Sequence, residues 1–159
     1  NGLLNTASHG VDLALWYAGP AQWVMAAENP TGRAGGELDF VVGFARGARA
    51  VFTYCDFTDY RVFEIDVLGS GGRITISNEG LLIGQYSIQD NEDVSGARQL
   101  AAHATEIPST VGAAMPQAID HVVAALDAEE PVFADHAVRT HAVLEAARAA
   151  ATRRETVFL

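Results

Sequence analysis

The stretch YRVFEIDVLGSGGRITIS, residues 60–77, decides the fold class of this chain. Its two halves are rich in β-branched and aromatic residues, which favour strands. Along an extended backbone Val62 and Glu64 point to one side and Phe63 to the other, so one face is packed and the other is partly polar. The glycine-rich segment GSGG between the halves allows a tight turn. The stretch therefore predicts an antiparallel β-hairpin.

Similar short runs, separated by turn-forming residues, predict further strands at residues 22–29, 38–47, 48–57, 81–88 and 155–159. Apolar residues at helical spacing instead predict helices at residues 3–17, 116–131 and 135–153. This order predicts an α+β fold: an open, mostly antiparallel β-sheet with helices packed on one face. We expect the other face to be free for oligomerisation or for contact with another domain.

Composition limits the partners and the compartment. The chain has 159 residues, of which 49% are hydrophobic, and its formal net charge is -10. This length and apolar content predict one globular domain. The acidic balance argues against nucleic acid and anionic membranes, and no apolar run is long enough for a membrane span. The single Cys55 excludes an intramolecular disulfide and fits a reducing cytoplasm, where we expect the protein to act.

Two kinds of site are argued against by the sequence. The GSGG segment is followed by a predicted strand, whereas a dinucleotide-binding glycine loop is followed by a helix. All ten basic residues are arginines, so this chain cannot supply a lysine as a Schiff base or as a proton donor. The histidines are dispersed, and only His9 with Asp12 resembles a ligand pair, which needs at least one more ligand. We therefore expect no metal and no cofactor-binding residues in this chain.

The predicted first helix carries three side chains that can hold or orient a proton. Asn5 and His9 are four residues apart, so they lie on one helix face, where the amide can fix the imidazole or share a ligand hydroxyl. Asp12 follows one turn later and can hold the other ring nitrogen or a neighbouring backbone group. From the residues alone, both a structural and a catalytic interpretation stay open.

The segment GLLNTASHGVDLALWYAG, residues 2–19, resembles the start of the C-terminal domain of the glucose-fructose oxidoreductase, inositol dehydrogenase and MocA family. The positions that match in order and spacing are Gly2, Asn5, His9, Asp12, Trp16 and Gly19. The hairpin at residues 60–77 and the last helix and strand are similar to the family as well, so the resemblance covers nearly the whole chain.

The resemblance implies an oxidoreductase that transfers hydride between NAD or NADP and a sugar, inositol or related polyol. In the family, an N-terminal Rossmann domain binds the dinucleotide and supplies a catalytic lysine. Residues 1–159 resemble only the C-terminal domain, which binds substrate and forms oligomers through its open sheet. We therefore expect a single substrate-binding domain, a homodimer or larger homo-oligomer, and no activity for these residues alone.

By the same resemblance, His9 is the catalytic imidazole that exchanges a proton with the substrate hydroxyl. Asn5 stands where many relatives carry Asp, and its amide orients a hydroxyl but does not act as a base. The turn at residues 56–61 falls where relatives contact substrate, which suggests Tyr60 and Arg61, although both also fit as strand ends. Asp12 joins this substrate-binding set mainly as support for the helix or for His9.

One alternative from a different class remains. The chain also fits a stand-alone α+β association module or small-ligand-binding module without catalytic activity. In that case Asn5, His9 and Asp12 are packing residues.

Overall fold

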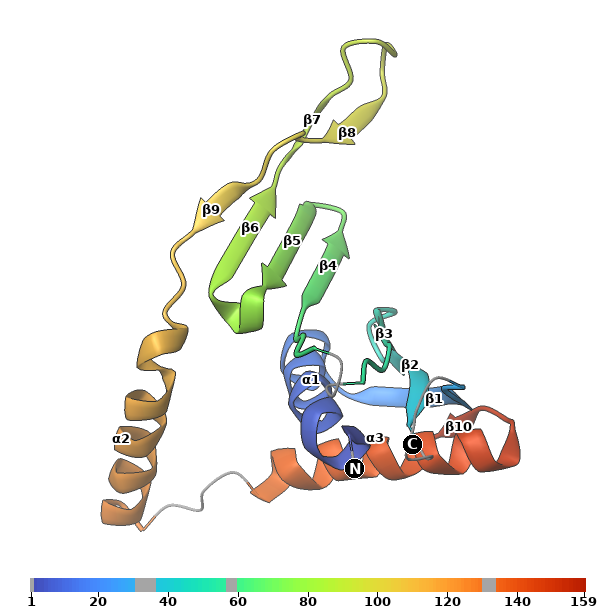
Figure 1. Ribbon diagram of the computed structural model, residues 1–159, viewed down its shortest axis with the longest axis vertical. Coiled ribbons are helices and arrows are strands. Elements are labelled where there is room, and N and C mark those ends of the chain that lie inside the picture. Colours follow the sequence, from blue (N-terminus) through green and yellow to red (C-terminus); the bar gives the residue numbers. More distant parts are fainter. Residues whose placement is uncertain (1, 31–36, 57–59, 130–133) are drawn as a thin grey trace. The chain divides into compact units, whose positions relative to one another are not determined.

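The computed structural model describes residues 2–30, 37–56, 60–129 and 134–159, with the side chains of residues 2–5 and 134 outside this description. Its elements fall into two units, Asn1–Asp59 with Pro131–Leu159, and Tyr60–Glu130. The first unit contains α1 (Gly2–Ala18), β1 (Ala21–Glu28), β2 (Leu38–Phe44), β3 (Arg49–Phe52), α3 (Ala134–Arg153) and β10 (Val157–Phe158) (Figure 1).

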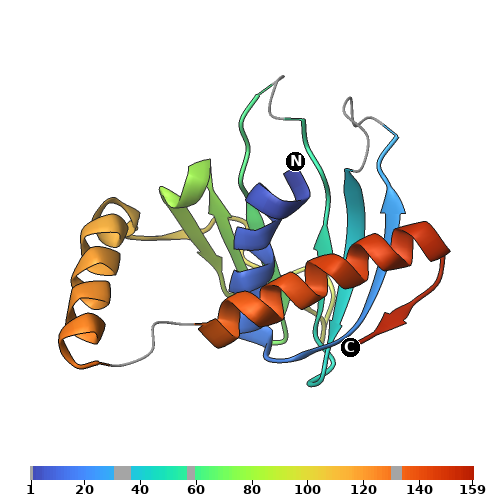
Figure 2. The same cartoon turned by 90° about the horizontal axis from the view of Figure 1, so that it is seen from below.

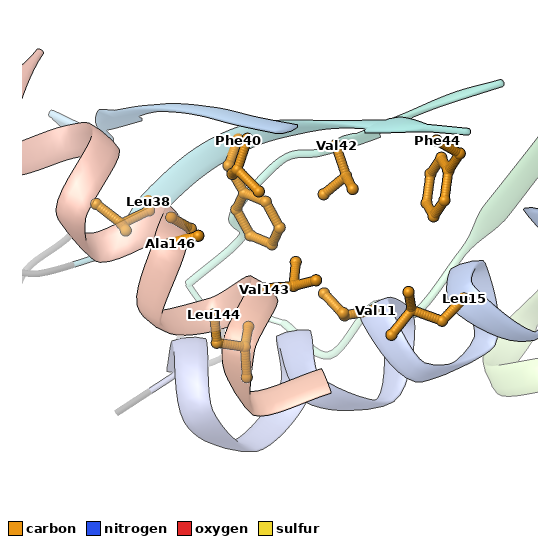
Figure 3. Packing of buried hydrophobic residues seen from close by; sticks show 11 residues of the cluster. Val11, Leu15, Leu38, Phe40, Val42, Phe44, Val143, Leu144 and Ala146 are labelled. Carbon is orange, nitrogen blue, oxygen red and sulfur yellow. The ribbon is translucent and has the colours of Figure 1, made fainter. Parts of the chain in front are cut away.

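The core of the first unit lies between its sheet and two helices. The strands have the order β10-β1-β2-β3, and all neighbouring pairs are antiparallel. Figure 2 shows α1 and α3 lying across the same face of this sheet. Alternate residues of β2 point to that face (Figure 3) and are buried, namely Leu38, Phe40, Val42 and Phe44. They meet Val11 and Leu15 of α1 and the buried side of α3, formed by Val143, Leu144, Ala146, Ala147 and Ala150.

The opposite face of this sheet, which we call the outer face, carries exposed apolar side chains. Register places Met25, Val41 and Val51 side by side across three strands, and Val51 is 72% exposed. On the neighbouring row the Trp23 ring covers Gly43, where a Cβ atom would overlap the ring. The Arg49 guanidinium carbon lies 6.0 Å from the centre of the same ring. These contacts occupy part of the outer face and leave its aliphatic row open.

The second unit contains a four-stranded antiparallel sheet, a separate hairpin and one helix. The sheet has the order β4-β5-β6-β9. Its elements are β4 (Ile65–Gly69), β5 (Gly72–Ser77), η1 (Asn78–Gly80), β6 (Leu82–Tyr86) and β9 (Thr105–Ile107). The hairpin pairs β7 (Ile88–Asp90) with β8 (Arg98–Leu100), and η2 (Val111–Ala113) leads into α2 (Ala114–Asp127).

Two apolar surfaces of the second unit lack a described partner. Register aligns Ile65, Ile76, Ile83 and Ile107 on one face of the sheet, one from each strand. No residue of α2 is buried. The exposed apolar positions of this helix include Met115, Ile119, Val122, Val123 and Leu126. An amphipathic helix draws most of its stability from packing its apolar side against another element. We therefore expect the apolar side of α2 to contact a partner.

The α+β class and the antiparallel strands are confirmed. Helices cover one face in the first unit as predicted, but α2, with no buried residue, covers nothing comparable in the second. The described strands are divided among separate sheets, because strand pairing does not continue from β3 to β4. Predicted strand 48–57 ends at Phe52, and beyond it the Tyr54 N–H donates to the side chain of Asp39 on β2 at 2.8 Å. In the described part of the chain, no helix is long and apolar enough to cross a membrane.

Replacing Leu144 with alanine tests the first unit's core. Leu144 is 2% exposed, so the variant should lose about 2–5 kcal/mol in the free energy of unfolding. The matched control is Leu126→Ala on α2, where the side chain is 65% exposed and the change should stay within about 0.5 kcal/mol. Urea unfolding measures both. Equal losses in the two variants would contradict the burial pattern.

Gly43→Ala tests the Trp23 contact on the outer face. The added methyl group overlaps the indole, so the ring must move, and we expect a loss of about 1–3 kcal/mol with a shift in tryptophan emission. Gly112→Ala is the control, because a Cβ atom there meets open space. Unchanged emission in Gly43→Ala would show that Trp23 does not lie on Gly43.

Candidate functional site

The candidate catalytic side chain His9 lies on the exposed side of α1. Val11 and Leu15 turn the apolar side of this helix into the core, and both are buried. His9 is exposed, as are Asp12 and Trp16. The spacing of three and then four residues puts these three side chains on one stripe of the helix. Asn5 occupies the preceding turn of α1, but its side chain lies outside the described residues.

Asp12 is held by α3. The Thr140 hydroxyl donates to Asp12 Oδ1 at 3.2 Å, and His136 Nδ1 lies 3.6 Å from the same oxygen. Thr140 is only 6% exposed, whereas the Asp12 and His136 side chains are 56% and 40% exposed. The contacts described for Asp12 therefore join it to α3.

Trp16 adds an aromatic contact to the same place. Its ring centre lies 6.0 Å from that of His136, with the two planes tilted by 41°. We call the set Asp12, Trp16, His136 and Thr140 the α1–α3 clasp. Asp12 and Trp16 lie on the same stripe of α1 as His9, one and two turns further along. The clasp therefore connects the polar side of α1, which carries the candidate imidazole, to α3.

Tyr60 and Arg61 belong to the second unit. Tyr60 is 65% exposed. Arg61 Nε lies 3.2 Å from Glu79 Oε1, and both side chains face solvent. An open hollow of about 320 Å³ is lined by Arg61 and Glu79 together with Val62, Phe63, Glu64, Ser77, Asn78 and Leu82. Asn78 and Glu79 have φ of 50° and 56°, and this left-handed backbone shapes the turn that presents Glu79.

A larger open hollow, of about 730 Å³, lies away from His9. It is lined by residues of β1 from Met25 to Glu28 and by the end of α3 with the turn that follows, including Thr152 and Arg154. Its lining includes the carboxylates of Glu28 and Glu155 but no histidine. We therefore do not assign it to the candidate catalytic site.

The strongest described polar contact of the second unit is structural. Arg73 Nε donates to Asp66 Oδ1 at 2.9 Å, and the guanidinium carbon lies 5.4 Å from the centre of the Tyr86 ring. The hydrogen bond to Asp66 raises the pKa of Arg73 above its already high ordinary value. Arg73 therefore keeps its charge at any physiological pH and ties β4 to β5.

The described residues do not fit a metal ion or a dinucleotide. In the described part of the chain, no group of three or more His, Cys, Asp or Glu side chains could hold a metal. The glycines that follow β4 form the turn of an antiparallel hairpin with β5, and the pyrophosphate cradle of a dinucleotide needs a helix N-terminus there.

His136 and Thr140 are the site residues that the sequence did not reveal. Their spacing of four residues on the last helix places them on one face, but nothing in the sequence pairs that face with α1. Thr140 and Asp12 are 128 residues apart along the chain. Only the packing of α1 on α3 brings them together.

Comparisons with known proteins show likeness in structure alone. No family model matches the sequence, and no curated protein matches it either. A protein of Desulfitobacterium hafniense assigned as an NADPH-dependent oxidoreductase superposes with a TM-score of 0.73 at 15% identity, over 98% of this chain and 47% of its own. Levoglucosan dehydrogenase in complex with NADH and levoglucosan gives 0.67 at 17% identity, over 100% of this chain and 50% of its own. The WlbA dehydrogenase of Bordetella pertussis, in complex with NADH and UDP-GlcNAcA, gives 0.66 at 19% identity, over 99% and 44%.

The chain thus spans about half the length of the solved structures it matches. Because their sequence identity to this chain is low, the likeness establishes the fold alone. At that level the expectation from the sequence holds: the chain has the fold of about half of each of these solved oxidoreductases.

Proposed function

We propose that this chain is the C-terminal, substrate-binding and oligomerisation domain of an NAD(P)-dependent oxidoreductase that acts on a sugar, inositol or related polyol. The observation that carries the proposal is the match of the whole chain to half of levoglucosan dehydrogenase, whose structure holds NADH and levoglucosan. The exposed His9 on α1 supports it, because a proton-exchanging imidazole must be reachable by substrate. The lone Cys55 is compatible with action in the cytoplasm.

The proposal divides the labour between this chain and polypeptide outside it. NAD or NADP and the catalytic lysine belong to the other part of the protein, since this chain has neither a lysine nor a dinucleotide cradle among its described residues. These residues alone should therefore not turn over substrate. What this chain supplies is binding, orientation and one proton-exchanging group.

Each candidate residue then has one role. His9 accepts the proton of the substrate hydroxyl when an alcohol is oxidised and returns it in the reverse direction. Asn5 orients that hydroxyl as donor and acceptor without changing its charge. Tyr60 and Arg61 contact other hydroxyl groups of the substrate. Asp12 acts through α1, because its described partners are on α3.

His9→Ala tests the catalytic role in the protein that carries this chain together with its dinucleotide-binding domain. Removing a general acid–base should lower kcat about 10²- to 10⁴-fold, with a smaller change in KM. The assay follows NADH absorbance with levoglucosan, myo-inositol and glucose as substrates.

The matched control is His103→Ala, which removes an exposed histidine of the second unit and should leave kcat within about twofold. Equal rates for His9→Ala and the unaltered enzyme would refute the role of His9. Turnover by residues 1–159 alone would refute the division of labour.

Oligomer formation through a sheet face is the second part of the proposal. The outer face exposes Val51 by 72% and Phe158 by 76%, and a monomer rarely leaves a contiguous apolar surface of this kind in water. A second copy that presents the same surface across a twofold axis covers both faces at once. The occupant we propose is therefore another copy of this chain.

Val51→Glu tests this association by placing a charge in the middle of the outer face. The variant should dissociate a dimer to monomer in light scattering coupled to size exclusion, because a carboxylate would be buried without a partner. Val138→Glu is the control on the helical side, where the side chain is 67% exposed. Monomeric behaviour of the unaltered protein would contradict the proposal.

A further inference from the structure

The direction in which His9 points depends on the rotation of α1 about its own axis. Each residue of an α-helix turns the next by about 100°, so a modest rotation of α1 carries an exposed side chain several ångströms around the helix. The apolar side of α1 is fixed by Val11 and Leu15 in the core. Aliphatic packing is non-directional, so the polar side needs its own constraint.

Thr140 supplies a directional constraint. It sits near the middle of α3 and is 6% exposed, yet its hydroxyl donates to Asp12 Oδ1 of α1 at 3.2 Å. A buried hydroxyl in a helix usually bonds to the carbonyl one turn earlier in its own helix, as Thr152 does with the Arg148 carbonyl at 2.9 Å. Thr140 instead spans two helices, so its hydrogen bond fixes Asp12 relative to α3.

His136 strengthens the same constraint from the preceding turn of α3. Its Nδ1 faces Asp12 Oδ1 at 3.6 Å, and its ring lies against Trp16. Asp12 is thereby held by two groups of α3, and Trp16 is held one turn further along α1. His9 is on the same stripe, three residues before Asp12.

We propose that Thr140 and His136 are positioning residues for the candidate catalytic helix: through Asp12 they set the rotation of α1 and so the direction of the His9 imidazole. This inference rests on the proposed function for its catalytic meaning, but the geometry it asserts stands without a substrate. Its consequence is that removal of a single buried hydroxyl on α3 alters His9, although Thr140 has no described contact with His9.

Thr140→Val is the decisive variant, because it keeps the shape of threonine and removes the donor. The readout is the set of His9 imidazole signals in a two-dimensional ¹H–¹³C NMR spectrum, assigned through His9→Ala. These signals should shift in Thr140→Val and return close to their original positions in Thr140→Ser, which restores the hydroxyl. In the enzyme with its dinucleotide-binding domain, Thr140→Val should lower kcat roughly ten- to a hundredfold, the cost of a misplaced reacting group.

Thr152→Val is the matched control, because Thr152 lies on the same helix, is exposed and bonds only within α3 among the contacts described for it. It should leave the His9 signals and kcat unchanged. His136→Gln, at a half-exposed position, is the second variant and should move the His9 signals together with the Trp16 indole signal. If Thr140→Val does not fold, His136→Gln alone decides the matter.

Unchanged His9 signals in the folded Thr140→Val and His136→Gln variants would overturn the inference. So would a shift in Thr140→Val that Thr140→Ser fails to reverse, because the methyl packing would then matter rather than the hydroxyl. The proposed function fails separately: if His9→Ala keeps full turnover while Thr140→Val still moves the His9 signals, the positioning contact is real and His9 is not catalytic.

Discussion

The burial of one face of β2 against two helices is the interaction on which the first unit depends. Leu38, Phe40, Val42 and Phe44 alternate along the strand, and their partners come from opposite ends of the chain, α1 and α3. Burying one large aliphatic or aromatic side chain contributes about 1.5–3 kcal/mol, so this layer is strong enough to hold segments that are distant in sequence. Once it forms, α1 and α3 lie side by side and their polar stripes meet.

The exposure of the candidate catalytic residue follows from that packing. The helix that buries Val11 and Leu15 necessarily turns His9, Asp12 and Trp16 away from the core. Asp12 then contacts Thr140 and Trp16 contacts His136, both on α3, and His9 stays exposed. Apolar side chains stay exposed on the outer face of the first sheet and on α2 of the second unit. Exposed apolar surface of this kind marks contacts with another protein or domain.

The sequence predicted what depends on local pattern. Helical spacing located α1, whose bounds Gly2–Ala18 lie within one residue of the prediction, and His9 and Asp12 both lie on its exposed side. Short apolar runs bounded by turn-forming residues located β1 and β2, and the hairpin pattern located β5. The predicted strand 81–88 divides into β6 and β7, and the predicted strand 60–69 begins only at Ile65.

What the sequence did not predict depends on contacts between distant segments. Just after the end of β3, the Tyr54 N–H bonds to the Asp39 side chain, a contact that no periodicity encodes. The β7–β8 hairpin forms around an acidic segment, residues 89–96, that lacks a strand pattern. The side-chain oxygen of Asn91 holds its turn by accepting from the N–H of Val94 at 2.8 Å. The pairing of Thr140 and His136 with Asp12 likewise needs the tertiary packing of α1 on α3.

Binding of a sugar or polyol at the His9 stripe is the central claim, and an NMR titration of the isotope-labelled protein that contains this chain and its dinucleotide-binding domain tests it most directly. With the oxidised cofactor present, levoglucosan or myo-inositol should shift the His9 imidazole signals in a saturable way and leave those of His103 and His121 in place. Saturable shifts confined to His103 or His121, or no shift of any histidine with a substrate that the enzyme turns over, would contradict the account.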